Sequence, residues 1–268
     1  MKAIINYYEQ FDEWGRLDRE PIEYKVNWHY IQKYLPSSGH ILDNGAGPGK
    51  YSMALAKEGY HVTLSDLTPK LVEVAKQKAN ELNLQQQFHN FLVADACNLE
   101  HLSNEQFDAA LMLGPMYHLQ KEADRVLAVK ELHRVTKIDG IVFVAFIPRT
   151  KHIFNSLMRP DMWRPNDHIE AIQHFSETGC FNHADANRFT GAYYFDIKEI
   201  EPFMESYGFQ TLQLIGSNIA TSMNDDHWEY WRQKGEEQQV LDLIIERAGD
   251  PYLLGMSSHL LYIGKKVK

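Results

Sequence analysis

Residues 40–51 read His-Ile-Leu-Asp-Asn-Gly-Ala-Gly-Pro-Gly-Lys-Tyr, and this stretch decides the fold. Its apolar start predicts a short strand, and its three alternating glycines predict a tight loop, because glycine serves where the backbone turns sharply or touches a ligand. The apolar positions of residues 50–58 predict a helix directly after the loop. A strand, a glycine-rich turn and a helix N-terminus form the ligand-binding corner of a doubly wound α/β sheet.

The glycine spacing narrows the class of ligand. A dinucleotide fingerprint, G-x-G-x-x-G, would need glycine at position 50, where this chain has Lys50. The observed G-x-G-x-G spacing favours a nucleoside that has no pyrophosphate to hold.

Acidic residues follow the next two predicted strands. Residues 61–64 form the second strand and lead to Asp66, which is placed to accept hydrogen bonds from ribose hydroxyls. Residues 88–94 form the third strand and lead to Asp95, which suits an adenine amino group. Residues 107–113 form the fourth strand, which opens into Gly-Pro-Met-Tyr-His.

This series resembles the class I S-adenosylmethionine-dependent methyltransferases, in which a glycine loop, a ribose-binding acid, an adenine-binding Asp and a loop after strand four follow in this order. The resemblance covers nearly the whole chain and implies S-adenosylmethionine as the cofactor. One departure is Asn44, where the family often has an apolar residue. The resemblance implies cofactor contacts from Asn44, Gly45, Ala46, Gly47, Gly49, Asp66, Leu67, Asp95, Ala96 and Leu113.

The N-terminal residues 8–17 also resemble a subset of these enzymes that act on small or unknown acceptors. In this comparison, Arg16 binds the methionine carboxylate of the cofactor through its planar guanidinium, and Tyr8 covers the same tail. The alternative for Arg16 is a surface ion pair with Asp12 or Glu13.

The resemblance implies an α/β fold with a Rossmann-like seven-stranded mixed sheet in the order 3-2-1-4-5-7-6, a last strand that is antiparallel, and helices on both faces. An Asp139–Gly140 turn leads into the fifth strand. The sequence places the later strands at 141–147, 208–215 and 258–265, and helices at 68–82, 122–136 and 196–207.

Segments outside the minimal fold predict a helical lid. Residues 1–36 form an N-terminal helical cap segment, residues 37–147 and 196–268 form the methyltransferase core, and residues 148–195 and 217–256 are lid inserts. Both inserts leave the carboxyl ends of strands, where open α/β sheets bind ligands, so we expect them above the acceptor site. The inserts are rich in large aromatic side chains, which either form the lid's own core or line a pocket: Trp163, Phe175, Phe181, Phe189, Tyr193, Tyr194, Trp228, Tyr230 and Trp231.

Methyl transfer from a sulfonium is an in-line displacement, so the protein must mainly align the acceptor and exclude water. A general base is needed only when the acceptor loses a proton. His118 is the catalytic candidate because it follows strand four, where the methyl group should point, and it either takes a proton or only positions the acceptor. Tyr117 is a second candidate for orienting the acceptor. His259 and Ser257 are weaker alternatives at the top of the last strand.

The composition and charge of the chain narrow the classes of binding partner. The chain has 268 residues, 36 acidic against 27 basic, and a net charge of −9, which disfavours nucleic acid as a partner. The apolar run 141–147 is too short to span a membrane, and Cys97 and Cys180 indicate neither a disulfide framework nor a metal site. We therefore expect a cytoplasmic monomer or homodimer with a small-molecule acceptor, without metal or membrane.

Four functions stay open at this stage. The first is methyl transfer to nitrogen, oxygen or sulfur of a small molecule. The second is methylation of RNA or protein, against which stand the lack of a basic patch and the excess of acidic residues in 217–256. The third is a protein that binds S-adenosylmethionine without turnover. The fourth is a nucleotide-dependent oxidoreductase, which Lys50 disfavours.

Overall fold

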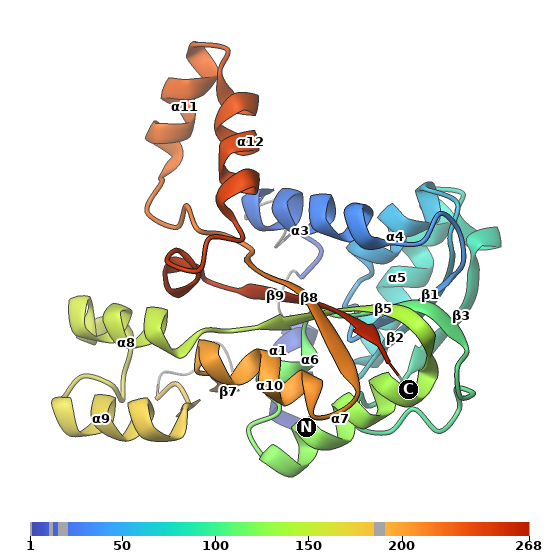
Figure 1. Cartoon of the computed structure of the whole chain (residues 1–268), viewed down its shortest axis with the longest axis horizontal. Coiled ribbons are helices and arrows are strands. Elements are labelled where there is room, and N and C mark those ends of the chain that lie inside the picture. Colours follow the sequence, from blue (N-terminus) through green and yellow to red (C-terminus); the bar gives the residue numbers. More distant parts are fainter. Residues whose placement is uncertain (1, 11–12, 16–20, 185–190, 268) are drawn as a thin grey trace.

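The computed structural model describes residues 2–10, 13–15, 21–184 and 191–267, and a seven-stranded sheet organises them (Figure 1). The strand order is β3-β2-β1-β4-β5-β9-β8, with β9 antiparallel to both of its neighbours and all other pairs parallel. The strands are β1 (His40–Asn44), β2 (His61–Asp66), β3 (Phe88–Val93), β4 (Phe107–Met112), β5 (Thr136–Phe146), β8 (Phe209–Gly216) and β9 (Leu260–Lys266).

The predicted fold class and strand order are confirmed. Two short strands, β6 (Cys180–Phe181) and β7 (Ala192–Tyr193), pair only with each other, so β8 and β9 are the sixth and seventh strands of the main sheet. The order 3-2-1-4-5-7-6 is therefore the observed one.

Helices cover both faces of the sheet and bury three apolar clusters against it. On one face, α3 (Pro21–Tyr34), α4 (Lys50–Lys57) and α5 (Pro69–Glu81) pack on strands β1 and β2. On the other face, α7 (Glu122–Val135) and α10 (Ile197–Glu205) pack on β4, β5 and β9 (Figure 1). The sheet is thus enclosed on both sides, as expected for parallel strands.

Most predicted element boundaries agree with the structure to within two residues, but the fifth strand does not. Strand β5 begins at Thr136, five positions before the predicted start. Asp139 has a left-handed backbone, with φ of 62°, and the pairing register with β4 shifts between Phe107 and Ala109. The predicted Asp139–Gly140 turn is therefore an irregularity inside a longer strand, because residues before and after it both pair with β4.

The first insert carries α8 (Arg149–Met158), α9 (Ile169–Thr178) and the β6–β7 hairpin, and it has its own core. The His152 ring lies at the centre of this core, with ring centroids of four aromatic side chains 4.4–4.8 Å away. Burial lowers the pKa of His152 to about 3, so the imidazole is neutral. Phe189 lies outside the described residues. The aromatic side chains that form this core are Trp163, Phe175, Phe181 and Tyr194.

The second insert forms a helical hairpin of α11 (Asp225–Gln233) and α12 (Glu237–Arg247) that projects from the sheet (Figure 1). Helix α12 contacts α3, and its buried Leu241 and Ile244 belong to the same apolar cluster as Val26 and Ile31. This hairpin therefore extends the α3 side of the molecule.

Across the described residues, no helix is long and apolar enough to cross a bilayer.

Candidate active site

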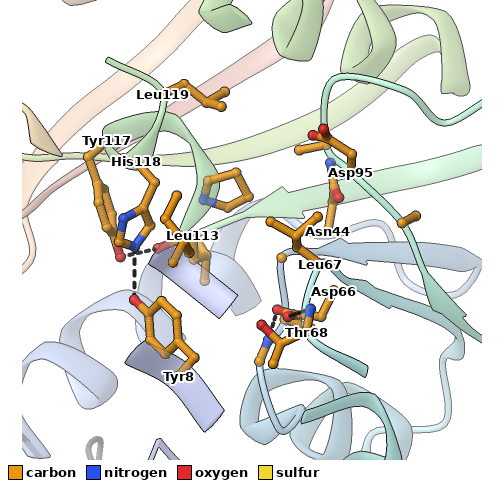
Figure 2. Close-up of a pocket in the computed structure, with 18 of the residues that line it drawn as sticks. Tyr8, Asn44, Asp66, Leu67, Thr68, Asp95, Leu113, Tyr117, His118 and Leu119 are labelled. Atoms are coloured by element: carbon orange, nitrogen blue, oxygen red, sulfur yellow. Dashed lines mark hydrogen bonds between the residues drawn. The ribbon is translucent and has the colours of Figure 1, made fainter. Parts of the chain in front are cut away.

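A cavity of about 670 Å³ opens at the carboxyl ends of β1, β2 and β4 (Figure 2). Its volume lies within the range of small-molecule sites, roughly 300–1,000 Å³. The glycine loop after β1 and the segments after β2, β3 and β4 supply most of its wall. Ile4 and Tyr8 of α1 (Lys2–Gln10) line it from the N-terminal segment. The cavity therefore lies where open α/β sheets bind their ligands.

Asp66 holds the glycine loop in place. Its carboxylate accepts hydrogen bonds from the backbone N–H of Gly47, at 2.7 Å, and from that of Thr68, at 2.8 Å. Thr68 precedes α5 and makes no side-chain cap. A carboxylate has about four lone-pair positions, so Asp66 keeps capacity to accept from ligand hydroxyls. Burial raises its pKa despite these two hydrogen bonds.

Two of the three glycines are required by close packing. A Cβ at Gly45, which has φ of 71°, would overlap the Pro115 ring, so the loop after β4 contacts the glycine loop directly. Gly49 has φ of 83°, and its Cβ would lie 2.7 Å from Leu64 Cδ1. Gly49 does not line the cavity, unlike Gly45, Ala46 and Gly47. Its place is between α4 and β2, where it lets the helix approach the strand.

Asn44 lies at the end of β1, where its side chain is 1 % exposed and lines the cavity. Its Oδ1 accepts a hydrogen bond from the Ser65 hydroxyl at 3.0 Å, which accounts for a polar residue at this position. Within the described part of the chain, its buried Nδ2 donates to no partner. A buried donor without a partner is costly, so this amide is suited to a bound ligand.

Asp43 adds a second buried carboxylate to the same wall. The Ser52 hydroxyl donates to it at 2.6 Å, yet burial and the negative charge of Asp66 raise its pKa to about 6. Two neighbouring carboxyl groups with raised pKa values favour a cationic ligand, because a positive charge stabilises the ionised form of each.

The segment after β3 forms the next part of the wall. The Asp95 carboxylate accepts from the Cys97 backbone N–H at 2.9 Å, and Asp95 and Ala96 both line the cavity. Leu67 and Leu113 contribute apolar surface between this segment and the loop after β4 (Figure 2). Burial and the neighbouring Asp95 raise the pKa of the Cys97 thiol to about 12, so the thiol is unreactive.

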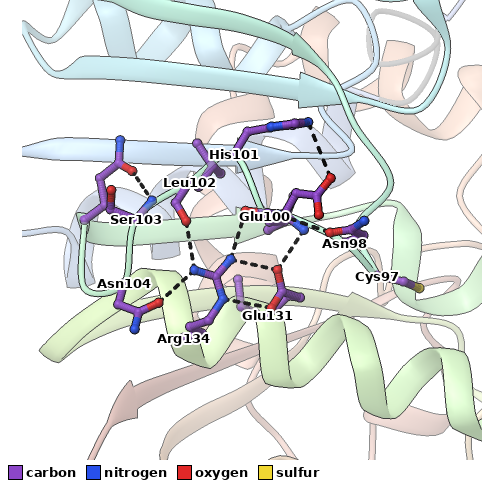
Figure 3. Close-up of polar contacts among 12 residues, drawn as sticks. Cys97, Asn98, Glu100, His101, Leu102, Ser103, Asn104, Glu131 and Arg134 are labelled. Carbon is purple, nitrogen blue, oxygen red and sulfur yellow. Dashed lines mark hydrogen bonds and ion pairs between the residues drawn. The ribbon is translucent and has the colours of Figure 1, made fainter.

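Arg134 of α7 supports that segment from behind (Figure 3). Its guanidinium donates to the backbone oxygens of Leu99 and Leu102, each at 2.8 Å, and forms two hydrogen bonds of 2.8 Å with Glu131. Glu131 in turn accepts from the Leu99 N–H at 2.7 Å, and Arg134 lowers its pKa. The loop that follows Asp95 is thus fixed by a planar, bidentate ion pair.

Tyr8 and His118 meet at the other end of the cavity, and both side chains line it (Figure 2). The Tyr8 hydroxyl lies 2.8 Å from His118 Nε2, with the two rings edge to face at 5.6 Å. Burial and the nearby His259 lower the pKa of His118 to about 4, so its imidazole is neutral near neutral pH.

Tyr117 also lines the cavity, and its hydroxyl donates to the Leu113 backbone oxygen at 3.2 Å. The weaker candidates His259 and Ser257 are not part of the cavity wall. His259 Nδ1 lies 2.8 Å from the buried Glu23 carboxylate of α3, and its ring is 5.6 Å from the Tyr117 ring. Arg16 lies outside the described residues.

The inserts contribute unequally to this cavity. Asn182 and Gly191 of the first insert line it, whereas no described residue of 217–256 does. Asn182, Gly191 and the neighbouring Gln120 were not among the predicted site residues. The sequence hints only at Gln120, which lies two residues after His118. Asn182 and Gly191 lie more than 60 residues further along the chain, and no local pattern connects them to the cavity.

Comparison with known proteins places this geometry in a family. The model of a methyltransferase domain matches residues 42–144. A ubiquinone biosynthesis O-methyltransferase of Xylella fastidiosa is 36 % identical over 133 residues, which is 48 % of this chain and 50 % of that protein. A tRNA (carboxymethyluridine(34)-5-O)-methyltransferase of Arabidopsis thaliana is 36 % identical over 111 residues, 41 % of this chain and 24 % of that protein. The chain spans half or less of the length of these relatives.

Solved structures share the fold over almost the whole chain. A SAM-dependent methyltransferase from Methanosarcina mazei superposes with a TM-score of 0.62 at 19 % identity, covering 89 % of this chain and 97 % of that one. The 1,6-didemethyltoxoflavin-N1-methyltransferase of Burkholderia thailandensis, solved with 1,6-didemethyltoxoflavin and S-adenosylhomocysteine, superposes with a TM-score of 0.58 at 14 % identity, covering 100 % and 86 %. At these identities the likeness concerns the fold.

The matched domain, the strand order and the glycine loop agree on one class of protein. Residues 42–144 match a methyltransferase domain and the fold is that of S-adenosylmethionine-dependent methyltransferases, so these findings support the predicted class I family.

Proposed function

We propose that this protein transfers the methyl group of S-adenosylmethionine to nitrogen, oxygen or sulfur of a small acceptor inside the cavity. The observation that carries the proposal is the arrangement at the glycine loop, where Asp66 fixes the loop amides beside Asp43 and Asn44. S-adenosylmethionine is a cation with a sulfonium, an ammonium and ribose hydroxyls, and these groups match the chemistry of that wall.

The donor contacts follow from the parts of the wall. The carboxylate of Asp66 accepts from the ribose hydroxyls, while Asp95 and Ala96 receive the adenine edge between Leu67 and Leu113. The buried charges of Asp43 and Asp66 favour a cationic donor over the anionic NAD. Arg16 and Tyr8 remain predicted contacts of the methionine tail.

The chemical step needs alignment more than acid–base catalysis. The acceptor atom attacks the methyl carbon, the carbon–sulfur bond breaks, and sulfur keeps the electron pair. An acceptor that carries a proton releases it after or during the transfer. His118 is neutral at working pH, so with Tyr117 it orients the acceptor and receives a proton only transiently.

Segments outside the sheet narrow the cavity, which supports a small acceptor. Helix α1 contributes Ile4 and Tyr8 to the wall, and the first insert contributes Asn182 and Gly191. We extend this to the 1–36 segment as a cap and to residues 148–195 as the lid over the acceptor. The lid role of 217–256 remains a prediction. The excess of acidic residues over basic ones in the chain weighs against a polyanionic acceptor such as RNA.

Calorimetric titration tests donor binding. We expect S-adenosylmethionine and S-adenosylhomocysteine to bind at micromolar strength and NAD not to bind. Binding of NAD alone would overturn the proposal.

Labelled methyl transfer tests the acceptor class. We expect label from S-adenosylmethionine to enter low-molecular-weight compounds of a metabolite extract rather than bulk tRNA. Labelling of tRNA, with binding that weakens steeply as salt rises, would assign the protein to the RNA methyltransferases instead.

A further inference from the structure

Helix α7 contributes two arginine side chains that hold segments of the cavity wall. Arg134 donates to backbone oxygens of the loop after β3 (Figure 3). Arg125, nine residues earlier on the same helix, donates to the backbone oxygens of Leu119, at 2.9 Å, and of Gln120, at 2.7 Å, in the segment after β4. One helix thus fixes the segments that follow β3 and β4.

The segment that Arg125 holds carries both candidate acceptor residues. Tyr117 and His118 end the short helix α6 (Pro115–His118), and Leu119 follows directly. A single helical turn is not stable on its own. The position of Tyr117 and His118 in the cavity wall therefore depends on contacts that fix the neighbouring backbone.

The same guanidinium contacts the first insert. Its central carbon lies 3.6 Å from the centre of the Tyr193 ring in β7, and Arg125 is only 6 % exposed. A planar guanidinium stacks on an aromatic ring in a way that a lysine ammonium does not reproduce. Burial lowers the pKa of Arg125, but a guanidinium stays charged, and the ring face and two carbonyl oxygens stabilise that charge.

Tyr193 is itself fixed within the insert. It pairs with Cys180 in the β6–β7 hairpin, and the cavity-lining Gly191 directly precedes β7. The Tyr193 ring packs edge to face on Phe195 at 4.6 Å, and Arg149 of α8 donates to its hydroxyl at 3.4 Å. A displacement of the hairpin therefore moves the ring on which the guanidinium is stacked.

We propose that Arg125 is a positioning residue of the active site, which couples the first insert to the turn that carries Tyr117 and His118. Because one planar group contacts both, the position of the insert sets the position of these two side chains. Arg125 does not line the cavity and acts only through the groups that it holds. The inference rests on the proposed function, because it describes how the acceptor side of that reaction is aligned. Arg134 holds the other wall through Glu131, without the insert.

Histidine NMR tests the coupling without knowledge of the acceptor. The full-length protein is labelled with carbon-13 at histidine Cε1 and saturated with S-adenosylhomocysteine, and the His118 signal is identified by its absence in His118→Gln. Arg125→Lys keeps the charge but loses the planar stack, so we expect the His118 signal to shift. Arg134→Lys makes the same substitution on the same helix and should leave the His118 signal in place.

The Tyr193 ring supplies a second test, which leaves the buried charge intact. Tyr193→Leu removes the aromatic face, whereas Tyr193→Phe keeps it and loses only the hydroxyl contact with Arg149. We expect Tyr193→Leu to shift the His118 signal as Arg125→Lys does, and Tyr193→Phe to leave it unchanged. The double variant Arg125→Lys/Tyr193→Leu should show no larger shift than the single variants, since both changes remove one contact.

Methyl transfer gives the functional readout. With labelled S-adenosylmethionine and a metabolite extract, we expect Arg125→Lys and Tyr193→Leu to slow transfer to small molecules about 10- to 100-fold, the range for a misplaced reacting group. Tyr193→Phe should keep the wild-type rate. The affinity for S-adenosylhomocysteine should stay at the wild-type value in all three variants, because the donor wall is held separately.

The possible failures are distinguishable. If the wild-type protein neither binds S-adenosylhomocysteine nor transfers label, the proposed function is wrong and this inference falls with it. If S-adenosylhomocysteine binds but the His118 signal stays in place in Arg125→Lys and Tyr193→Leu, the inference alone is overturned. Equal effects of Tyr193→Leu and Tyr193→Phe on that signal would also overturn it, because the aromatic face would then have no role.

Discussion

Asp66→Asn should weaken both the glycine loop and the binding of the methyl donor. The carboxylate of Asp66 accepts from two backbone N–H groups at 2.7 and 2.8 Å. An amide oxygen can replace only one of these acceptors, and its NH₂ group then faces the other N–H. Losing one hydrogen bond to a charged group costs about 1.5–3 kcal/mol. Because Asp66 lines the cavity, the loss in the free energy of unfolding should lie at the lower end of this range.

The donor loses a further contact in the same variant. If Asp66 accepts from the ribose hydroxyls, the dissociation constant for S-adenosylhomocysteine should rise about 10- to 150-fold, which corresponds to the same 1.5–3 kcal/mol. Urea unfolding measures the first effect, and calorimetry well below the unfolding midpoint measures the second.

Asp108→Asn is the matched control for this prediction. The Asp108 carboxylate accepts from the His40 backbone N–H at 2.8 Å and from Lys137 at 2.6 Å, beside the first residue of β1 and away from the cavity wall. It should lower stability without changing donor affinity. An unchanged donor affinity in Asp66→Asn, with the loss of stability present, would refute the assignment of the ribose to this carboxylate.

Three further predictions follow from the charges around the cavity. Donor affinity should rise between pH 5 and pH 7 in calorimetry, since Asp43, with a pKa of about 6, ionises there, and Asp43→Asn should remove that rise. The folded pKa of His118, about 4, lies below the unfolded value of 6.5, so the unfolded state binds more protons and stability falls as pH drops below 6.5. This group should remove about 2 kcal/mol of unfolding free energy between pH 7 and 5. In urea unfolding of His118→Gln, the loss between these two pH values should be smaller by that amount. Arg134→Ala should cost about 2–4 kcal/mol of unfolding free energy, because Glu131 and two backbone oxygens lose their partner, and an unchanged urea midpoint would contradict this.

The order of the sheet could be predicted from the sequence because its signals are local. Each parallel strand is a short apolar run followed by a glycine or an acidic residue, and the order of these signals matches a family pattern. The start of the fifth strand was predicted wrongly, because Asp139 and Gly140 are residue types that occur both in turns and in strand irregularities. Pairing with β4 on one side and β9 on the other decides between the two, and neither pairing is visible locally.

The part of the cavity wall that follows the parallel strands was predictable for the same reason, and the part that comes from the first insert was not. Asp66, Asp95 and the glycine loop lie at the ends of consecutive elements, so their positions along the chain give their positions in space. Gln120 and Asn182 are 62 residues apart, and their contact depends on how the β6–β7 hairpin packs. The sequence also did not indicate that Gly49 serves helix packing rather than the cavity wall.

The aromatic core around His152 has a consequence for how acceptor choice can evolve. The first insert has its own core of buried rings, and Asn182 on its cavity edge is exposed and belongs to no apolar cluster of the sheet. Mutations at that edge should therefore cost little stability, while on the proposed function Asp66 and the glycine loop stay under constraint from donor binding. On that function, a lineage can acquire a new methyl acceptor by drift in one peripheral segment while the wall proposed to bind the donor is inherited unchanged.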